Sequence, residues 1–424
     1  MKAPVTIAII GAGKRGEAYA NYARLHPDQL RVVAVAEPRD LLRARLAEAH
    51  GIKPEHCFRS YEELAQAPRL SDAVAICTQD RMHLAPVEKL APKGYAILLE
   101  KPMSPDLSEC EKIVACIKEH GNAFAVCHVL LYTDLTTKLR ELVRGGAIGE
   151  IVSIQHTEPV AWWHQAHSFV RGNWRNEEDS SFMLLAKSCH DMDWMRHIVN
   201  RRCTRVASFG SLRHFKASEK PEGAADRCWD CASAIESNCP YSAKRIYYQN
   251  FGRDRRANYI NDVITEGRNT REAVEHALRE GPYGRCVYSC DNDVVDHQTV
   301  MLEYEGPISA TFTMTAFTPA LDRMTRIFGT RGYLETDFSK IKVFDFLTEK
   351  ETVYETAGSR NSGDASSGHG GGDYHLMRCF VEALATGDFS GIYSGADETL
   401  EAHRIVFAAE EARREGRIVA LPTA

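Results

Sequence analysis

Hydrophobic positions in the first 127 residues form short apolar runs that alternate with helix-like segments. Residues 5–10 (VTIAII) are an apolar, β-branched run, and apolar residues then recur at helical spacing from Ala18 to Leu25. Further apolar runs lie at 31–36, 73–77, 96–99 and 123–127, with helical patterns at 83–90 and 105–120. Strands alternating with helices predict a parallel sheet covered on both faces. Ligands of such sheets bind beyond the carboxyl ends of the strands.

A glycine-rich turn follows the first predicted strand at once. It reads Gly11, Ala12, Gly13, Lys14, Arg15 and Gly16, and a helical pattern comes directly after it. Strand, glycine turn and helix are the context of a dinucleotide-binding fingerprint, although an ordinary glycine turn is the alternative. Gly11 permits the turn, Gly13 lets the backbone approach a diphosphate, and Gly16 lets the helix pack closely on the strand. The free N–H groups at the start of that helix would bind the phosphates.

Glu37 stands at the end of the second predicted strand. An acidic side chain there can accept hydrogen bonds from the ribose hydroxyls of NAD, and it would repel the 2′-phosphate of NADP. Arg39 and Arg15 could partly offset that repulsion. The sequence therefore favours NAD as the cofactor, with a solvated strand-end carboxylate as the alternative for Glu37.

Polar side chains also follow three later strands of the predicted sheet. They are Thr78, Gln79, His83, Glu100, Lys101 and His128. Because the carboxyl ends of parallel strands meet at one edge of the sheet, we expect these residues to lie around the cofactor.

The second half of the chain has a different pattern. Residues 297–304 and 307–316 alternate between apolar and polar positions, which predicts paired strands. The runs 324–329 and 332–337 flank a short turn, which predicts a hairpin.

Several segments together resemble the Gfo/Idh/MocA family, the group of glucose–fructose oxidoreductase and inositol dehydrogenase. The strongest are the glycine turn at 11–16 and the sequence Glu100-Lys101-Pro102. The others are GGAIGEI at 145–151, Asn173-Trp174-Arg175, His190-Asp191-Met192-Asp193 and FGTRGYLETD at 328–337. The similarity spans nearly the whole chain except about residues 214–290.

The resemblance implies an α/β protein of two domains. An N-terminal Rossmann domain would occupy residues 1–127. A C-terminal α/β domain with a large, mostly antiparallel sheet would occupy 128–424, with a cysteine-bearing insertion at about 214–290. The open face of that sheet is expected to close over the nicotinamide and a sugar-like substrate. Members of the family typically oxidise a secondary alcohol of a sugar or cyclitol, or reduce the matching ketone, without a catalytic metal.

The resemblance also assigns the proton chemistry. Lys101 would be the base that takes the proton of the substrate hydroxyl, with His190 bonding that hydroxyl or relaying its proton. Burial and the positive nicotinamide both disfavour a charged lysine, which suits Lys101 to this role. A surface lysine and a histidine satisfied by backbone are the alternatives. Many members carry an aspartate four residues before the histidine, whereas this chain has Ala186 followed by Lys187. Lys187 would then contact the substrate, or the proton relay differs.

Other residues are candidates for binding the substrate. Trp174 and Arg175 belong to a segment similar to the family. His369 and Asp373 lie in a glycine-rich stretch, Ser-Ser-Gly-His-Gly-Gly-Gly-Asp, that could close on a ligand. A linker ending in a helix-capping aspartate is the equal alternative.

The insertion contains a cysteine cluster. Cys228 and Cys231 are three residues apart, and Cys239 and Cys286 follow. Four thiolates in a closed set are typical of structural zinc, so we expect these four residues to bind Zn²⁺, with Cys290 as a rival for Cys286. The alternatives are an iron–sulfur cluster, a disulfide or unliganded thiols.

Composition narrows the class of partner and the compartment. The net charge of −6, from 52 basic and 58 acidic residues, argues against a nucleic acid as the main partner. We find no apolar run long enough to span a membrane. The N-terminal apolar stretch leads into the glycine turn instead of a cleavage site, which predicts a strand and a cytoplasmic protein. The 13 cysteines fit a reducing compartment.

These features predict an NAD-dependent oxidoreductase acting on a carbohydrate, working as a homo-oligomer. A redox-neutral glycosidase is the close alternative. It would oxidise a ring hydroxyl, eliminate the aglycone, add water and return the hydride. A non-enzymatic regulator that binds the cofactor is a third possibility.

Overall fold

The computed structural model describes residues 3–356 and 368–422. Its N-terminal part is a parallel sheet of six strands in the order β3-β2-β1-β4-β5-β6. The strands are β1 (Val5–Ile10), β2 (Leu30–Ala36), β3 (Cys57–Phe58), β4 (Ala73–Ile76), β5 (Ala96–Leu99) and β6 (Phe124–Val126). This arrangement confirms the predicted Rossmann-like sheet.

Helices cover both faces of this sheet. Alternate residues of β1 enter different cores: Ile7 and Ile9 pack in one cluster, whereas Ala8 and Ile10 pack in the other. Buried runs of this kind are typical of parallel sheets. The helices of this part are α1 (Lys14–Leu25), α2 (Asp40–His50), α3 (Tyr61–Gln66), α4 (Leu84–Leu90) and α5 (Leu107–His120).

The C-terminal part is built on a sheet of nine strands in the order β14-β13-β12-β11-β7-β10-β9-β8-β15. Its pairs are antiparallel except that of β7 with β10. The strands are β7 (Ile151–Pro159), β8 (Cys203–Ser211), β9 (His297–Tyr304), β10 (Ile308–Thr315), β11 (Met324–Gly329), β12 (Gly332–Thr336), β13 (Lys340–Asp345), β14 (Lys350–Glu355) and β15 (Val419–Ala420). The expected large, mostly antiparallel sheet is therefore confirmed.

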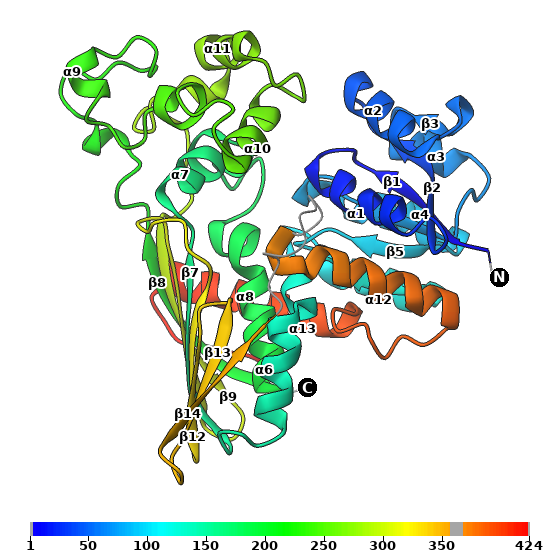
Figure 1. The fold of residues 1–424 in the computed structure, drawn as a ribbon, viewed down its shortest axis with the longest axis vertical. Coiled ribbons are helices and arrows are strands. Elements are labelled where there is room, and N and C mark those ends of the chain that lie inside the picture. Colours follow the sequence, from blue (N-terminus) through cyan, green and yellow to red (C-terminus); the bar gives the residue numbers. More distant parts are fainter. Residues whose placement is uncertain (1–2, 357–367, 423–424) are drawn as a thin grey trace.

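Among the described residues, helices cover one face of the large sheet and leave the other open. These are α6 (Asp134–Arg144), α8 (Met183–Val199) and α13 (Ala396–Glu415), which lie between the sheet and the N-terminal part (Figure 1). Along β9, Val300 and Leu302 are buried, whereas Met301 between them is 55% exposed. The open face therefore points away from the cofactor domain. This corrects the expectation that the open face closes over the nicotinamide.

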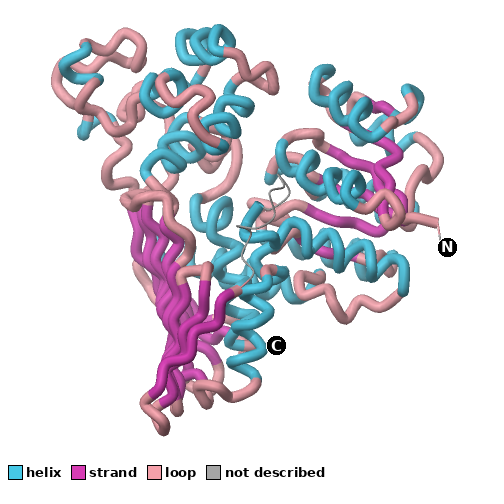
Figure 2. Tube along the Cα trace, in the orientation of Figure 1, coloured by secondary structure: helices cyan, strands magenta, loops and turns pink. Residues whose placement is uncertain are grey.

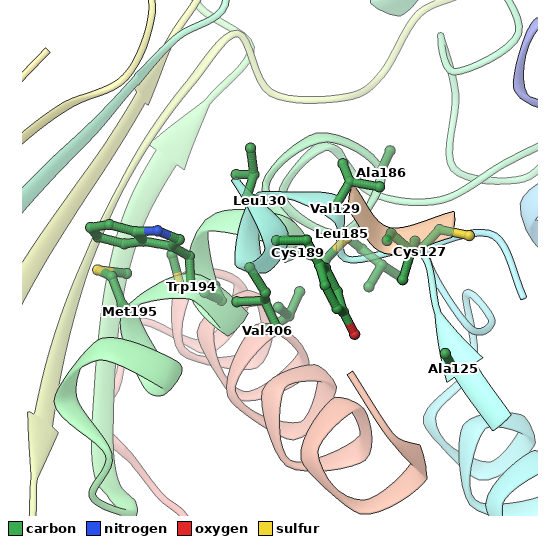
Figure 3. Close-up of a cluster of buried hydrophobic side chains, with 14 of the residues drawn as sticks. Ala125, Cys127, Val129, Leu130, Leu185, Ala186, Cys189, Trp194, Met195 and Val406 are labelled. Carbon is green, nitrogen blue, oxygen red and sulfur yellow. The ribbon is translucent and has the colours of Figure 1, made fainter. Parts of the chain in front are cut away.

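The two parts share one continuous core. Helix α12 (Gly372–Thr386) packs against α1 and the turn at Val129–Tyr132, and α13 packs against both α5 and α8. Figure 3 shows Leu130 beside Trp194 and Val406, which come from that turn, α8 and α13. The buried Trp194 indole donates to Thr136 Oγ1 at 2.9 Å, so its polar atom is satisfied. The shared core fixes α8 relative to the first sheet.

The insertion forms a small helical unit between β8 and β9 (Figures 1 and 2). Its helices are α9 (Ser233–Glu236), α10 (Arg255–Ile264) and α11 (Arg271–Glu280). It has its own apolar cluster, in which Phe215, Tyr247 and Leu278 are fully buried. That cluster also includes Ala166 and Val170, so the unit rests on the segment after β7. No helix among the described residues is long and apolar enough to cross a membrane.

Candidate active site

The glycine-rich turn has the geometry that a bound diphosphate requires. Gly11 has φ +89°, and a Cβ there would lie 2.6 Å from the Cys77 carbonyl oxygen. A Cβ on Gly16 would overlap the carbonyl oxygen of Gly11, whereas one on Gly13 would meet no atom closer than 3.6 Å. Helix α1 starts after Gly13 without a side-chain cap, so its first N–H groups are open to a ligand. The turn therefore fits a dinucleotide phosphate.

Glu37 is placed to bind a ribose. Its carboxylate is buried, accepts a hydrogen bond from the Ala12 amide at 2.8 Å, and accepts another from Arg39 Nε at 2.7 Å. Burial raises the pKa of Glu37, but the hydrogen bonds and charge of Arg39 outweigh it and hold that pKa below its usual value. Arg15 turns away to Glu100 and Asp373, whereas Arg39 pairs with the Glu37 carboxylate.

Residues after β4 connect the two domains. His83 Nδ1 lies 2.8 Å from the Pro102 carbonyl and Nε2 lies 3.2 Å from the Thr78 carbonyl, which ties the loops after β4 and β5 together. The buried Asp80 accepts hydrogen bonds from Ser181 Oγ at 2.9 Å and Trp174 Nε1 at 3.3 Å. Asp80 belongs to the polar segment that follows β4, and its side chain joins the cofactor domain to the segment before α8. Gln79 beside it is exposed.

Lys101 lies at the carboxyl end of β5, where the sequence placed it. Its Nζ donates a 2.6 Å hydrogen bond to the backbone carbonyl of Ala186 on α8. Glu100 points the other way, into the glycine turn, and accepts from Arg15 Nε and the Tyr19 hydroxyl, each at 2.6 Å. Burial raises the pKa of Glu100, but Arg15 and Lys101 lower it further, so the carboxylate stays ionised. The lysine amine is thus separated from the neighbouring carboxylate.

His190 stands one turn after Ala186 on α8 and faces two other imidazoles. Its ring centroid is 5.5 Å from that of His128 and 5.8 Å from that of His369. Burial, followed by the charge of Lys101, holds the pKa of His190 well below its usual value, so the ring is neutral. Its Nδ1 is buried without a hydrogen-bond partner. A buried polar atom without a partner is one of the features that catalytic groups show.

His128 is buried between His190 and His403, with ring centroids 5.5 and 5.8 Å away. Burial and the charges of Lys101 and Arg196 lower the pKa of His128 to about 3. This neutral, buried ring follows β6 (Phe124–Val126) and packs directly against His190.

His369 and Asp373 form a second polar pair at the same place. His369 Nδ1 lies 3.2 Å from Asp373 Oδ2, and Asp373 Oδ1 accepts from Arg15 Nη2 at 2.6 Å. Burial raises the pKa of Asp373, but Arg15 and His369 hold it far below its usual value. The helix cap at this point is Gly371, so Asp373 is not the cap. The residues of the glycine-rich stretch before Gly368 lie outside the described part of the chain.

Lys187 joins a buried network of charges that the sequence did not indicate. Its Nζ is 2.9 Å from Glu158 Oε1 on β7, and Arg323 Nη2 is 3.0 Å from the other oxygen of Glu158. Arg323 Nε also donates to Asp191 Oδ1 at 2.5 Å, and Asp191 contacts His156 Nε2 at 3.0 Å. Lys187 therefore lies on the same helix turn as His190 but is neutralised by Glu158.

An aromatic wall borders the same region. The rings of Trp163 and His164 are stacked with centroids 5.3 Å apart, and Phe169 lies 5.8 Å from His164 and 6.3 Å from Trp174. Burial and the charges of Lys187 and His167 hold the pKa of His164 well below its usual value. Aromatic faces beside polar groups suit sugar rings. In the sequence, His164 lies in the stretch 162–167, which is rich in aromatic and histidine residues and so indicates a surface for a sugar ring or a packed core.

Arg175 does not join this group of residues. Its guanidinium pairs with Asp291 at 3.0 Å and with Asp179 at 3.1 Å. It thus anchors the insertion, and the structure places its neighbour Trp174 closer to the candidate site.

The predicted zinc site is not supported. Cys228, Cys231, Cys239 and Cys286 do line one small cavity of about 30 Å³. Among residues 3–356 and 368–422, however, no group of three or more His, Cys, Asp or Glu side chains is arranged to hold a metal ion. Arg171 Nη2 instead donates to Cys228 Sγ at 3.5 Å, and this cation would repel a metal. The rival Cys290 donates to the Cys286 carbonyl at 3.2 Å. The spacing correctly grouped the four thiols around one cavity, but it does not determine whether they are arranged as metal ligands.

The chain is similar to known oxidoreductases and to related enzymes that act on sugars. The chain is 21% identical to the oxidoreductase YteT of Bacillus subtilis over 76% of its own length and 77% of that protein. It is 25% identical to 2,7-anhydro-N-acetylneuraminate hydratase of Escherichia coli, over 50% of the chain and 54% of the hydratase. The structure of levoglucosan dehydrogenase, in complex with NADH and levoglucosan, superposes with a TM-score of 0.71 at 16% identity. It covers 99% of this chain and 100% of that one.

Two family descriptions account for most of the sequence. The NAD-binding Rossmann fold of the oxidoreductase family matches residues 5–128, and its C-terminal alpha/beta domain matches residues 140–421. Together with the glycine turn and Glu37, the first match establishes NAD as the cofactor class of this fold. The chain therefore belongs to the Gfo/Idh/MocA family of oxidoreductases.

Proposed function

We propose that the protein transfers a hydride between a secondary hydroxyl of a sugar or sugar derivative and the nicotinamide of NAD. The observation that carries this proposal is that Lys101 Nζ bonds the carbonyl of Ala186, one helical turn before His190, whose buried Nδ1 has no hydrogen-bond partner. An amine and an imidazole near the carboxyl edge of the sheet suit a substrate hydroxyl.

The proposed roles follow from the protonation states. When bound, NAD⁺ supplies the hydride acceptor. Lys101 takes the hydroxyl proton on its amine as the C–H bond gives up its hydride. His190 is neutral, so the ring nitrogen that faces the hydroxyl donates to it or accepts from it according to the tautomer. The aromatic wall at 163–174 would bind the apolar face of the sugar ring.

Turnover with a panel of sugars tests this proposal directly. Full-length protein, NAD⁺ and each sugar are mixed, and NADH is followed by absorbance. Lys101→Met should slow NADH formation by ~10²–10⁴, whereas Lys89→Met on the exposed side of α4 should leave it unchanged. NADH formation at the wild-type rate in Lys101→Met would contradict the proposal.

The redox-neutral glycosidase is the second candidate, and the His369–Asp373 pair favours it. Eliminating an aglycone and adding water needs an acid–base group besides the one that takes the hydroxyl proton. His369 is oriented by Asp373, partly exposed, and adjacent to His190. Release of free sugar from glycosides without net NADH would support this function. Stoichiometric NADH from free sugars, with no cleavage of glycosides, would exclude it.

We also propose a homo-oligomer assembled through the open face of the large sheet. That face exposes large apolar side chains, with Phe209 71% and Met301 55% accessible. Exposed apolar patches of this kind mark protein–protein contacts. Light scattering of the wild type and of Phe209→Lys with Met301→Lys tests it, since the double variant should dissociate.

A further inference from the structure

Helix α10 of the insertion lies against the glycine-rich turn of the other domain. Asp262 on α10 forms an ion pair with Lys14 Nζ, and its second oxygen is 3.8 Å from Arg45 Nη1 on α2. The Asp262 side chain is only 15% exposed. Lys14 and Arg45 also share Glu17, at 3.4 and 3.3 Å. A partly buried, charge-assisted contact of this type is stronger than an exposed ion pair.

Tyr259 reinforces this contact from the same face of the helix. It precedes Asp262 by three residues, and residues at this spacing are neighbours on a helix surface. Lys14 Nζ lies 5.9 Å from the centroid of its ring, within cation–π range. The Tyr259 side chain is 51% exposed, so part of the ring faces open space beside the turn.

The other end of α10 contacts the aromatic wall. The Arg256 guanidinium lies 5.2 Å from the ring centroid of Trp163, which in turn stacks on His164. One helix therefore touches both the glycine-rich turn and the aromatic wall. Lys14 and Arg15 are the first two residues of α1, where a dinucleotide phosphate is expected to bind, so α10 lies beside that expected site.

We propose that α10 is a clamp that retains the dinucleotide. Asp262 and Tyr259 hold the insertion on Lys14, so the cofactor leaves only when this contact opens. This inference rests on the NAD-binding domain and is independent of the proposed substrate, because its test measures cofactor release alone. A retained cofactor suits a catalytic cycle in which the hydride returns to the same active site.

Stopped-flow release of NADH from the full-length protein tests the clamp. NADH-loaded protein is mixed with excess NAD⁺, and the loss of NADH fluorescence gives the dissociation rate. Asp262→Asn should speed release about 5- to 10-fold, and Asp262→Lys should speed it further by repelling Lys14 and Arg45. Tyr259→Leu should also speed release. Glu280→Gln, an equal charge change on the exposed end of α11, is the matched control and should release NADH at the wild-type rate.

Hydrogen exchange gives a second measurement that does not depend on variants. Amides of residues 255–264 should exchange more slowly when NADH is bound. Unchanged exchange in α10 and unchanged release in all three variants would overturn the proposal. Slower release from Asp262→Asn would also overturn it, because Asp262 would then compete with the diphosphate for Lys14.

Discussion

Lys101 Nζ donates a 2.6 Å hydrogen bond to the carbonyl oxygen of Ala186, a residue of α8 and not of its own domain. Ala186 stands four residues before His190, and its backbone carbonyl accepts this bond although its side chain has no polar group. The contact crosses the domain boundary and places the amine one helical turn from His190. The position of His190 relative to Lys101 is therefore set by the shared core, which fixes α8 against the first sheet.

Replacing Lys101 by Met should remove turnover and spare cofactor binding. The change deletes the proton acceptor but keeps the length and volume of the side chain. We expect kcat to fall by ~10²–10⁴, the usual worth of a positioned acid–base group. The dissociation constant for NADH, measured by fluorescence titration, should stay within about twofold. A large loss of NADH affinity with kcat unchanged would show that Lys101 serves the cofactor instead.

Replacing Glu37 by Ser should shift the cofactor preference toward NADP. The change removes the carboxylate that repels a 2′-phosphate and frees Arg39, whose guanidinium now binds Glu37 at 2.7 Å. We expect the ratio of the dissociation constants for NAD and NADP to move at least about tenfold in favour of NADP, the effect of ~1.4 kcal/mol. Calorimetry with both cofactors measures it. Arg39→Met is the matched variant and should weaken NADP binding in the Glu37→Ser background.

The parts of the site that are local in sequence could be predicted. The glycine turn, Glu37 and Lys101 each follow a strand directly, so the strand order alone brings them to one edge. Arg323 and Glu158 could not be predicted, because Glu158 meets Lys187 and Arg323 only after β7 and the segment before β11 are paired in the large sheet. Spacing suggested zinc because it reports which thiols are near, not the tetrahedral arrangement that a metal requires.

Arg15 should be a structural cation whose loss destabilises the protein. It bridges the buried carboxylates of Glu100 and Asp373. Removing one partner of a buried ion pair costs ~3–5 kcal/mol, because a charge is left unpaired. We expect Arg15→Met to lower the free energy of unfolding by about that amount at pH 7. Denaturant unfolding measures it.

The pH dependence distinguishes this role. Glu100 and Asp373 both have folded pKa values below the unfolded ones, so they stabilise the protein above an unfolded pKa of ~4. That stabilisation is lost as the pH falls toward the folded values. The difference in the free energy of unfolding between Arg15→Met and the wild type should therefore shrink below about pH 4. A constant difference would show that Arg15 acts through packing.

Metal chelators should leave the protein unaffected. The cysteine cavity of the insertion is stabilised by Arg171 and by burial of the thiols, and burial raises the pKa of Cys239 and of Cys286. We expect EDTA and phenanthroline to leave the unfolding temperature unchanged. Thiol titration of the denatured, unreduced protein should give all 13 cysteines. A lower unfolding temperature after chelation, together with released zinc, would contradict this prediction and show that the insertion binds zinc.

His128 should make the protein less stable in mild acid. Its folded pKa of about 3 lies below the unfolded value of ~6.5, so between these two pH values the unfolded chain binds one more proton. The stabilisation from the neutral ring is complete above about pH 6.5 and falls by ~1.4 kcal/mol per pH unit as the pH drops toward 3. His167 and His403, whose pKa values are also lowered to about 3, add to the same slope. Urea unfolding between pH 4.5 and 7 measures it, and His128→Gln should reduce the slope by about one proton. His276→Gln on α11 is the control, and an equal reduction in both variants would show that the proton is taken up elsewhere.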